Sequence, residues 1–473
     1  MGSVSNGTLD GFADHANHAA KEKPIILGLA FPSPGHIQGM VQVSTHLVSK
    51  GYKVFLIGYE DYQTSIEKGG AEFIRHPWRW VLPDPKSTEG MSLHDKLVSN
   101  LKFVFVDATP AAFSILKDTL ERLRIEYPGR QVIVLYESLA QGVLPFMYGA
   151  PLPKGFDSMP KVINFSTTMD LSSDPLVPPF GPGLPYNPTE ENIQIWKNIY
   201  DARVPSEKAL NKHYDDTMRP LGATISMEGW LWDTSMRVGD ITLLPTSAST
   251  DYPRQTKNPK IRYIGGLPLK PMNPDFVYPG WWSEITSNAA LPASSPEKKK
   301  VVMVAQGTAM LDYSELIVPT IKALASRDNV ILVATLGKRG ASIALGEGED
   351  PLTEIPANTK VIDYLPYDAL LPYADVFICN AGYGGFMHGV MNGVPMVLAG
   401  TQADKAEVAA RAEYVGVAVN LRVTSPSPGA LRAGIDKVLS NESYKNKAVE
   451  LKAENEAMDA MGQIEKIVEE FTE

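Results

Sequence analysis

The strongest constraint on the fold is an alternation of short runs rich in Val, Ile and Leu with longer amphipathic stretches, which begins at residue 25. Strands that alternate with helices in this way form parallel sheets joined by helical crossovers. The chain has 473 residues, which is too long for one ordinary core and favours two domains. We therefore predict two doubly wound α/β units, each with a parallel sheet. The clearest predicted strands are 25–30, 54–59, 132–136, 162–165 and 241–244 in the first half, and 301–305, 330–334, 361–363, 376–379 and 396–398 in the second.

Composition and charge narrow the class of protein. With 44% hydrophobic and 21% charged residues, the chain has the composition of a soluble globular protein, and its net charge of −10 argues against nucleic acid as a partner. No run of about 18 apolar residues is present, and residues 1–23 lack the basic start and apolar core of a signal peptide. We therefore expect no membrane span and a cytoplasmic location. The single cysteine, Cys379, excludes an internal disulfide and a thiolate zinc cluster.

The stretch 286–300, TSNAALPASSPEKKK, has the composition of an exposed linker, since it is rich in Pro, Ser, Ala and charge. We place the domain boundary there, between an N-terminal domain at 24–285 and a C-terminal domain at 301–440. The polar residues 1–23 are predicted to be a disordered extension. Residues 441–473 are predicted to form a C-terminal helix that packs back on the N-terminal domain.

Two such domains bring the carboxyl ends of both sheets to a shared crevice, where open α/β sheets bind ligands. The first predicted strand is followed by FPSPGHIQGM, which puts His36 at the start of a helix. A neutral histidine there can take a proton from a hydroxyl near neutral pH. Glu137 ends an apolar run at the same edge of the sheet and can orient the imidazole. The alternatives are a histidine that only caps its helix and a carboxylate that is only solvated.

The second half has polar and glycine-rich turns directly after its predicted strands. Thr308 can offer a hydroxyl and a backbone N–H to a phosphate. In FICNAGYGGFMHGV, Gly382, Gly384 and Gly385 let the backbone approach a ligand and begin a helix whose free N–H groups favour an anion. This stretch matches neither a P-loop nor the dinucleotide fingerprint. The alternative is a tight strand-to-helix turn without a function.

Two further strand ends in the second half carry candidate ligand contacts. Tyr364 can stack on a flat base, although it can equally be an ordinary core aromatic. Asp404 and Lys405 lie in another strand-to-helix loop, where a carboxylate can accept hydrogen bonds from sugar hydroxyls; the alternative is a solvated pair. All these features fall at carboxyl ends of strands in one domain, which favours a common site.

Four short motifs carry a resemblance to a known family: FPSPGH at 31–36, QGT at 306–308, NAGYGG at 380–385 and ADK at 403–405. In this order and spacing they resemble the inverting UDP-sugar glycosyltransferases of family 1, and among these the fungal and bacterial branch that glycosylates small molecules. The resemblance covers the chain from about residue 23 to the C terminus. It implies the GT-B fold, in which two Rossmann-like doubly wound parallel-sheet domains face each other across a cleft.

The resemblance also implies an activity and its participants. The expected reaction is a metal-independent transfer of a hexose, glucose foremost, from a UDP-sugar to a hydroxyl of a small molecule in natural-product glycosylation. UDP-glucose is the expected co-substrate, and no prosthetic group is expected. The acceptor can be a phenolic, a polyketide, a sterol or a lipid alcohol, and we expect a monomer. Two other classes stay open: a nucleotide-sugar epimerase of the same fold, and a non-catalytic nucleotide-sugar-binding subunit.

The roles that the resemblance implies fall into two groups. His36 takes the acceptor proton as general base, and Glu137 orients it. Tyr364 stacks on uracil, Asn380 faces the leaving phosphates, and the sugar contacts Asp404 and Lys405. The nucleotide-sugar contacts implied by the family are Thr308, Tyr364, Asn380, Gly382, Tyr383, Gly384, Gly385, His388, Asp404 and Lys405.

Three residues depart from the family pattern. Glu137 stands where an aspartate is frequent, and His388 where many relatives have a glutamate on the ribose hydroxyls. Asn380 replaces a histidine that commonly faces the leaving phosphates. A charge-assisted hydrogen bond is about twice as strong as a neutral one. We therefore expect asparagine to bind the leaving phosphates less strongly than histidine, by on the order of 1 kcal/mol.

The acceptor is expected to be apolar, because the first domain carries aromatic and methionine side chains that suit a broad pocket. The alternative is that these side chains belong to the hydrophobic core. They are Trp78 and Trp80 in HPWRWVLP, and Met227, Trp230, Trp232 and Met236 in SMEGWLWDTSM.

Overall fold

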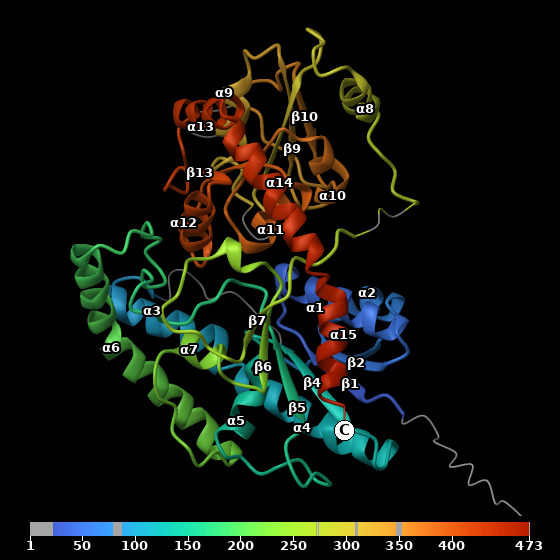
Figure 1. The fold of residues 1–473 in the computed structure, drawn as a ribbon, viewed down its shortest axis with the longest axis vertical. Coiled ribbons are helices and arrows are strands. Elements are labelled where there is room, and N and C mark those ends of the chain that lie inside the picture. Colours follow the sequence, from blue (N-terminus) through green and yellow to red (C-terminus); the bar gives the residue numbers. More distant parts are fainter. Residues whose placement is uncertain are drawn as a thin grey trace, which may run out of the picture.

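The computed structural model describes residues 22–78, 88–270, 272, 274–307, 311–346 and 352–472. They form two α/β domains, and Figure 1 shows the first domain below and the second above it. Each domain is built around one sheet whose strands all run parallel, which confirms the predicted fold class. The predicted disorder of 1–23 concerns residues outside the described ranges, except Glu22 and Lys23.

The first domain holds a seven-stranded sheet in the order β3-β2-β1-β4-β5-β6-β7. Its central strands are nearly continuous apolar runs, and they are buried because helices cover both faces. The chain winds outward from β1 in one direction and from β4 in the other, so a crevice opens between their carboxyl ends. The strands are β1 Ile25–Leu29, β2 Lys53–Gly58, β3 Glu72–Arg75, β4 Val132–Glu137, β5 Lys161–Phe165, β6 Ile241–Leu244 and β7 Ile261–Tyr263.

The second domain holds a six-stranded sheet in the order β10-β9-β8-β11-β12-β13. Here the winding direction changes between β8 and β11, which puts the loops after these two strands side by side. The strands are β8 Lys300–Ala305, β9 Val330–Thr335, β10 Thr359–Ile362, β11 Val376–Cys379, β12 Met396–Leu398 and β13 Ala418–Asn420.

All the strands predicted from the sequence are present, with ends that differ by no more than two residues. The sequence reading missed β3, β7 and β13, and each of these lies at an edge of its sheet. An edge strand is short and partly exposed, so its sequence lacks the continuous apolar run that marks a central strand.

Helices flank both sheets, and among the described residues none is both long and apolar enough to cross a bilayer. The first-domain helices are α1 Pro34–Ser49, α2 Gln63–Lys68, α3 Leu93–Leu101, α4 Thr109–Glu126, α5 Leu144–Met147, α6 Glu190–Met218 and α7 Leu231–Ser235, with a π-helical turn, η3, at Lys102–Val106. The others are α8 Trp282–Ala290, α9 Ile317–Leu324, α10 Tyr367–Leu370, α11 Tyr383–Asn392, α12 Lys405–Val415, α13 Pro428–Ser440, α14 Glu442–Ala457 and α15 Ala460–Glu470.

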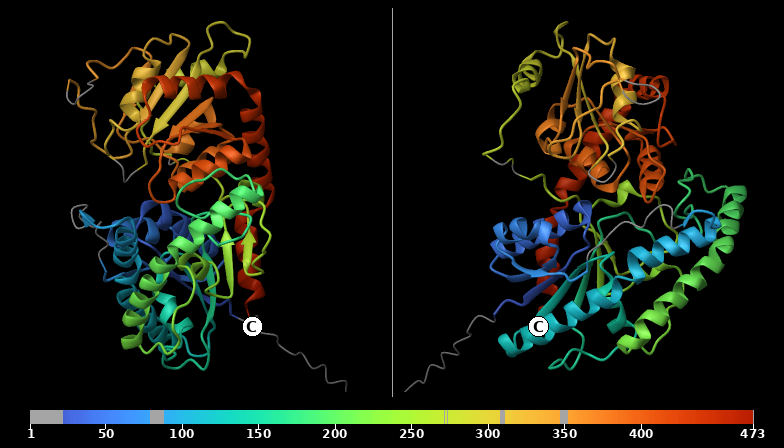
Figure 2. Two further views of the ribbon diagram at one scale, coloured as in Figure 1. Left: turned by 90° about the vertical axis from the view of Figure 1, so that its left-hand side faces the viewer. Right: turned by 180° about the vertical axis from the view of Figure 1, so that it is seen from behind.

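The C-terminal segment crosses from the second domain to the first as two helices, α14 and α15 (Figure 2). Ile464 and Ile467 of α15 join the hydrophobic core on one face of the first sheet. Glu465 forms an ion pair with Lys50 at the end of α1, with 2.9 Å between Oε2 and Nζ. In the stretch expected to be a linker, residues 286–290 form the end of helix α8. This helix buries Ile285, and the Asn288 side chain bonds the backbone of Lys299.

A buried ion-pair network joins the two domains near the crevice. Arg411 on α12 donates a hydrogen bond from Nε to Asp251 of the first domain at 2.7 Å, and its Nη1 contacts Glu407 at 3.0 Å. The Oε1 atom of Glu407 accepts the backbone N–H groups of Gly181 and Gly183 at 2.8 Å each. Charges this deeply buried are tolerated because each is paired and hydrogen-bonded. The network fixes the position of α12, which begins at the candidate site.

Candidate active site

His36 and Glu137 meet at the crevice edge of the first sheet. His36 lies in the first turn of α1, directly after β1, and Glu137 is the last residue of the neighbouring strand β4. The imidazole Nδ1 lies 2.9 Å from Oε1 of Glu137. The Glu137 side chain is fully buried, and its Oε2 accepts the backbone N–H of Leu139 at 3.0 Å. The predicted pair is therefore in hydrogen-bond contact.

Thr167 completes this arrangement, and the sequence reading missed it. Its hydroxyl donates to Oε1 of Glu137 at 2.8 Å and lies 2.6 Å from Nδ1 of His36. Thr167 follows β5, the strand beside β4, so its place two residues beyond a predicted strand was the available signal. With Nδ1 held by Glu137 and Thr167, Nε2 is the nitrogen that can take a proton from a ligand.

The electrostatic setting of His36 combines opposing influences. Burial lowers the pKa of the imidazole, whereas the charge and hydrogen bond of Glu137 and the charge of Asp404 raise that pKa, and the net shift is upward. The His36 side chain keeps 23% of its surface exposed, so a ligand can reach it. Asp404 belongs to the second domain and directly precedes α12. The loop after β5 contacts Glu407 of α12 through Gly181 and Gly183, so strand ends of the two sheets face each other.

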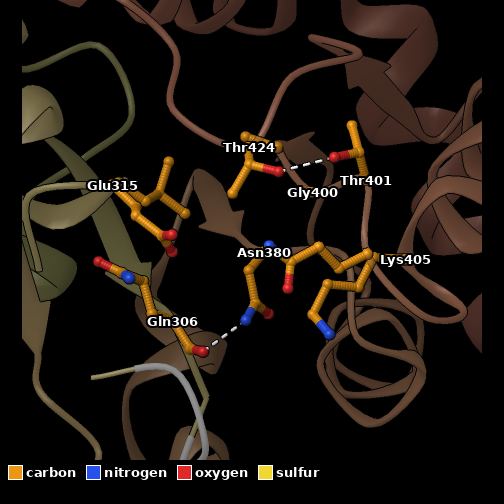
Figure 3. Close-up of a pocket in the computed structure, with 10 residues that line it drawn as sticks. Gln306, Glu315, Asn380, Gly400, Thr401, Lys405 and Thr424 are labelled. Carbon is orange, nitrogen blue, oxygen red and sulfur yellow. Dashed lines mark hydrogen bonds between the residues drawn. The ribbon is translucent and has the colours of Figure 1, made fainter. Parts of the chain in front are cut away.

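The second domain has a pocket at the carboxyl ends of β8, β11 and β12 (Figure 3). It holds about 220 Å³ of unfilled space, part of it open to solvent. Asn380 and Lys405, both predicted as ligand contacts, line this pocket. Its full lining is Gln306, Glu315, Leu316, Asn380, Ala399, Gly400, Thr401, Gln402, Lys405 and Thr424. Of these, Glu315, Thr401 and Thr424 lie outside helices and strands, where no motif or periodicity marked them.

Asn380 is held at the centre of this pocket by neighbouring main chain. Its Nδ2 donates to the carbonyl oxygen of Gln306 at 2.5 Å, a bond drawn in Figure 3. The next residue, Ala381, has φ of 61°, in the left-handed region that is unfavourable for alanine. Ala403, before Asp404, has φ of 53°. Strained backbone of this kind clusters at ligand sites, and here it occurs on two loops of the same pocket.

The glycine turn leads into α11 as predicted, but its residues differ in what they can contact. A Cβ built on Gly384 would meet no atom within 4 Å, whereas one on Gly385 would lie 3.5 Å from Sγ of Cys379. Open space is therefore present above Gly384 in the first turn of α11. The Tyr383 side chain is only 8% exposed and packs in the core.

The remaining predicted contacts are spread along the same side of the second sheet. The guanidinium carbon of Arg339 lies 4.6 Å from the centre of the Tyr364 ring. His388 on α11 donates from Nδ1 to Asp368 at 2.8 Å. Neither Tyr364 nor His388 lines the pocket of Figure 3. Thr308 lies outside the described residues.

A second pocket lies in the first domain beside the His36–Glu137 pair and holds about 320 Å³ of unfilled space, part of it open to solvent. The Phe31 ring in its wall lies 5.4 Å from the His36 ring. The π-helical turn η3 contributes Phe105, and such turns are frequent at functional sites. The lining is Ala30, Phe31, Pro32, Tyr59, His76, Trp78, Phe105, Ala108, Thr109, Ala112, Leu139, Ala140 and Gln141.

The side chains expected to form an acceptor pocket have different positions. Trp78 lines the first-domain pocket, and Trp80 lies outside the described residues. Met227, Trp230, Trp232 and Met236 are buried in the hydrophobic core. The Trp232 ring supports the pocket from behind, because it packs edge-on against Phe105 at 5.5 Å.

Comparisons with known proteins identify relatives of the chain. Residues 331–471 match the family described as "Erythromycin biosynthesis protein CIII-like, C-terminal domain". The chain is 36% identical to "UDP-glucosyltransferase 1" of Beauveria bassiana over 98% of its length and 97% of the relative's. It is 28% identical to "UDP-glucosyltransferase A1" of Starmerella bombicola, with 96% and 93% covered.

Solved structures agree in fold. The glycotransferase of kitacinnamycin superposes with a TM-score of 0.66 at 18% identity, over 95% of this chain and 99% of that one. Two parallel-sheet domains, facing strand ends and full-length similarity to UDP-glucosyltransferases lead to one conclusion: the chain belongs to the family 1 small-molecule UDP-glycosyltransferases of the GT-B fold.

Proposed function

We propose that this enzyme transfers glucose from UDP-glucose to a hydroxyl of an apolar, aromatic small molecule, with inversion and without a metal ion. The observation that carries the proposal is the contact between Nδ1 of His36 and the buried Glu137, 2.9 Å apart. This pair lies beside an apolar pocket in one domain and opposite a polar pocket in the other. An epimerase or a non-catalytic subunit would need no base beside an apolar pocket.

In the proposed mechanism the acceptor lies in the first-domain pocket with its hydroxyl at Nε2 of His36. The hydroxyl oxygen attacks the anomeric carbon, its proton passes to Nε2, and the bond between that carbon and the diphosphate oxygen breaks. UDP leaves with the electron pair, and the configuration at the anomeric carbon is inverted. Glu137 stabilises the imidazolium that forms, and Thr167 keeps the ring and the carboxylate aligned.

The nucleotide sugar is proposed to occupy the second domain. The diphosphate binds the N–H groups at the start of α11, and the hydroxyl of Thr308 is proposed as a further phosphate ligand. Uracil stacks on the face of Tyr364 that Arg339 leaves open. Because Asp368 holds the Nδ1–H of His388, the Nε2 atom can accept a ribose hydroxyl. Asp404 and Lys405 contact the sugar hydroxyls.

Mass spectrometry of the purified protein with a panel of UDP-sugars and aromatic alcohols tests this function. We expect a product heavier than its acceptor by one hexose, formed best with UDP-glucose. Anomeric proton couplings measured by NMR in the product report inversion directly, and an excess of chelator should leave the rate unchanged. Hydrolysis or epimerisation of the UDP-sugar without transfer would contradict the proposal.

Replacing Gly384 by alanine tests where the diphosphate binds. The added Cβ would meet no protein atom within 4 Å, so folding stability should stay the same or rise slightly. If the diphosphate lies there, the methyl group should weaken UDP binding by about tenfold, or about 1.4 kcal/mol, in a calorimetric titration. Gly429→Ala is the matched control, because Gly429 is also the second residue of a helix, α13, and has similar space around it. Equal UDP affinity in both variants would contradict the assignment.

Asn380→His introduces the residue that the family resemblance places at the leaving phosphates. A cationic imidazole would make a charge-assisted hydrogen bond, so we expect UDP to bind as tightly as to the unaltered protein, or up to about tenfold more tightly. Asn358→His is the control, because the Asn358 amide also bonds backbone carbonyls but precedes β10, at the opposite end of the sheet. Markedly weaker UDP binding in Asn380→His alone would contradict the phosphate role.

A further inference from the structure

Gln141 is a buried polar residue in the wall of the first-domain pocket that the mechanism above does not use. It begins the short 3₁₀ turn η4 at Gln141–Val143 and is only 4% exposed. Its Oε1 accepts the hydroxyl of Tyr214, a fully buried residue of α6. Its Nε2 is buried and has no hydrogen-bond partner within the described part of the chain. A buried donor without a partner is costly, so this amide favours a ligand that supplies an acceptor.

The amide is held in place rather than free to swing. Tyr214 fixes one end of it. The turn η4 also packs tightly on α4, since a Cβ on Gly142 would lie 2.7 Å from the backbone of Ala112. A donor held in this way needs little ordering when a ligand arrives, which strengthens discrimination between ligands.

The other described residues of the pocket wall are uncharged. Burial lowers the pKa of His76 to about 4, so its imidazole is uncharged near neutral pH. The Trp78 backbone N–H donates to its Nδ1 at 3.1 Å, which puts the ring proton on Nε2. Tyr59 stacks on the His76 ring with 4.9 Å between centres. Among the described residues that line the pocket there is no cation to pair with a carboxylate, and the aromatic rings suit a flat ligand.

We infer that Gln141 is a specificity-determining residue, whose Nε2–H donates to an uncharged oxygen, such as a ring carbonyl, on a flat aromatic acceptor. This inference rests on the proposed function, because it assigns the first-domain pocket to the acceptor. The oxygen that binds Gln141 is distinct from the hydroxyl that reacts at His36. A molecule without such an oxygen leaves the amide unpaired and is disfavoured, as in other sites built around one polar contact.

A pair of matched acceptors tests the inference. 2-Hydroxyanthraquinone and 2-hydroxyanthracene share a three-ring skeleton and a reacting hydroxyl, and only the first has ring carbonyls. With UDP-glucose, the ratio of their kcat/KM values is compared between the unaltered protein and Gln141→Met, which keeps side-chain length but removes the donor. We expect this ratio to fall about tenfold, through loss on the quinone alone. The different acidity of the two hydroxyls cancels when the ratios are compared.

Two further variants complete the test. Gln194→Met alters an exposed glutamine of α6 and should leave the ratio unchanged. Tyr214→Phe removes the hydroxyl that holds the amide and should lower the ratio in the same direction, which keeps the inference testable if Gln141→Met fails to fold. An unchanged ratio in Gln141→Met, or in Tyr214→Phe where only that variant folds, would overturn the inference.

The experiment also separates this inference from the proposed function. If the unaltered protein transfers glucose to neither compound, their binding without UDP-glucose is measured by calorimetry. Quinone binding that weakens about tenfold in Gln141→Met would support the role of Gln141 while the proposed reaction fails. Equal binding in the two proteins, or no binding of either compound, would overturn the inference itself.

Discussion

Replacing His36 by alanine is expected to lower the rate of glucose transfer to a phenolic acceptor by roughly 10²- to 10⁴-fold, the contribution typical of a well-placed general base. Nδ1 of this ring is bonded to Glu137, which leaves Nε2 to take the acceptor proton, and the side chain is 23% exposed, so a ligand can reach it. UDP should bind with unchanged affinity, because its proposed contacts lie in the other domain. Steady-state kinetics together with a calorimetric UDP titration therefore measure both halves of the prediction on one variant.

His46→Ala is the matched control for this experiment. His46 lies on the same helix, α1, with 20% of its side chain exposed against 23% for His36, and it faces Glu465 of α15 at 3.8 Å. Its loss should change stability slightly and the transfer rate by less than about twofold. The loss of transfer rate in His36→Ala should also be smaller for more acidic phenols, because their hydroxyl proton is removed more easily. A normal transfer rate in His36→Ala would refute the mechanism.

The parts of the fold that could be predicted are those with a strong local signal. Central strands such as β4 are buried on both faces, so their sequences are continuous apolar runs that can be recognised without tertiary information. The edge strands β3, β7 and β13 have mixed sequences, and their pairing with a neighbouring strand defines them. Helix α8 extends into the predicted linker because burial of Ile285 outweighs the loop-like composition that follows it.

The predicted site residues could be identified from the sequence because of their place in the sheet topology. His36, Glu137, Asn380 and Lys405 all follow, or end, strands of parallel sheets, and such strand ends must lie at one edge. Thr167 is 131 residues from His36 in sequence, and no local pattern links the two. Aromatic composition did not identify the residues of the acceptor pocket. A core position, such as that of Trp232, and a pocket wall both use the same aromatic side chains.

Glu137→Gln is expected to change the pH dependence of transfer as well as its rate. Burial lowers the pKa of His36, and the charge and hydrogen bond of Glu137 are the main influences that raise it again. Glutamine has nearly the same shape but no charge, so the pKa of His36 should fall. The base works only when the imidazole is neutral, and transfer therefore declines as the pH falls through this pKa. In the variant, the acid limb of the rate profile should move to lower pH.

The plateau rate should fall as well, on the order of 10²-fold, because an imidazole with a lower pKa is a weaker base and the imidazolium loses its counter-charge. Glu465→Gln is the control, since it removes the carboxylate that faces His46, a residue on the same helix as His36. This variant should change neither the plateau rate nor the position of the acid limb. The profile is measured as kcat/KM for one acceptor between about pH 4 and 9, a range that spans the usual histidine pKa. A purely structural role of Glu137 could not produce the expected shift of the acid limb. An acid limb that stays in place or moves to higher pH would show that Glu137 does not raise the pKa of His36.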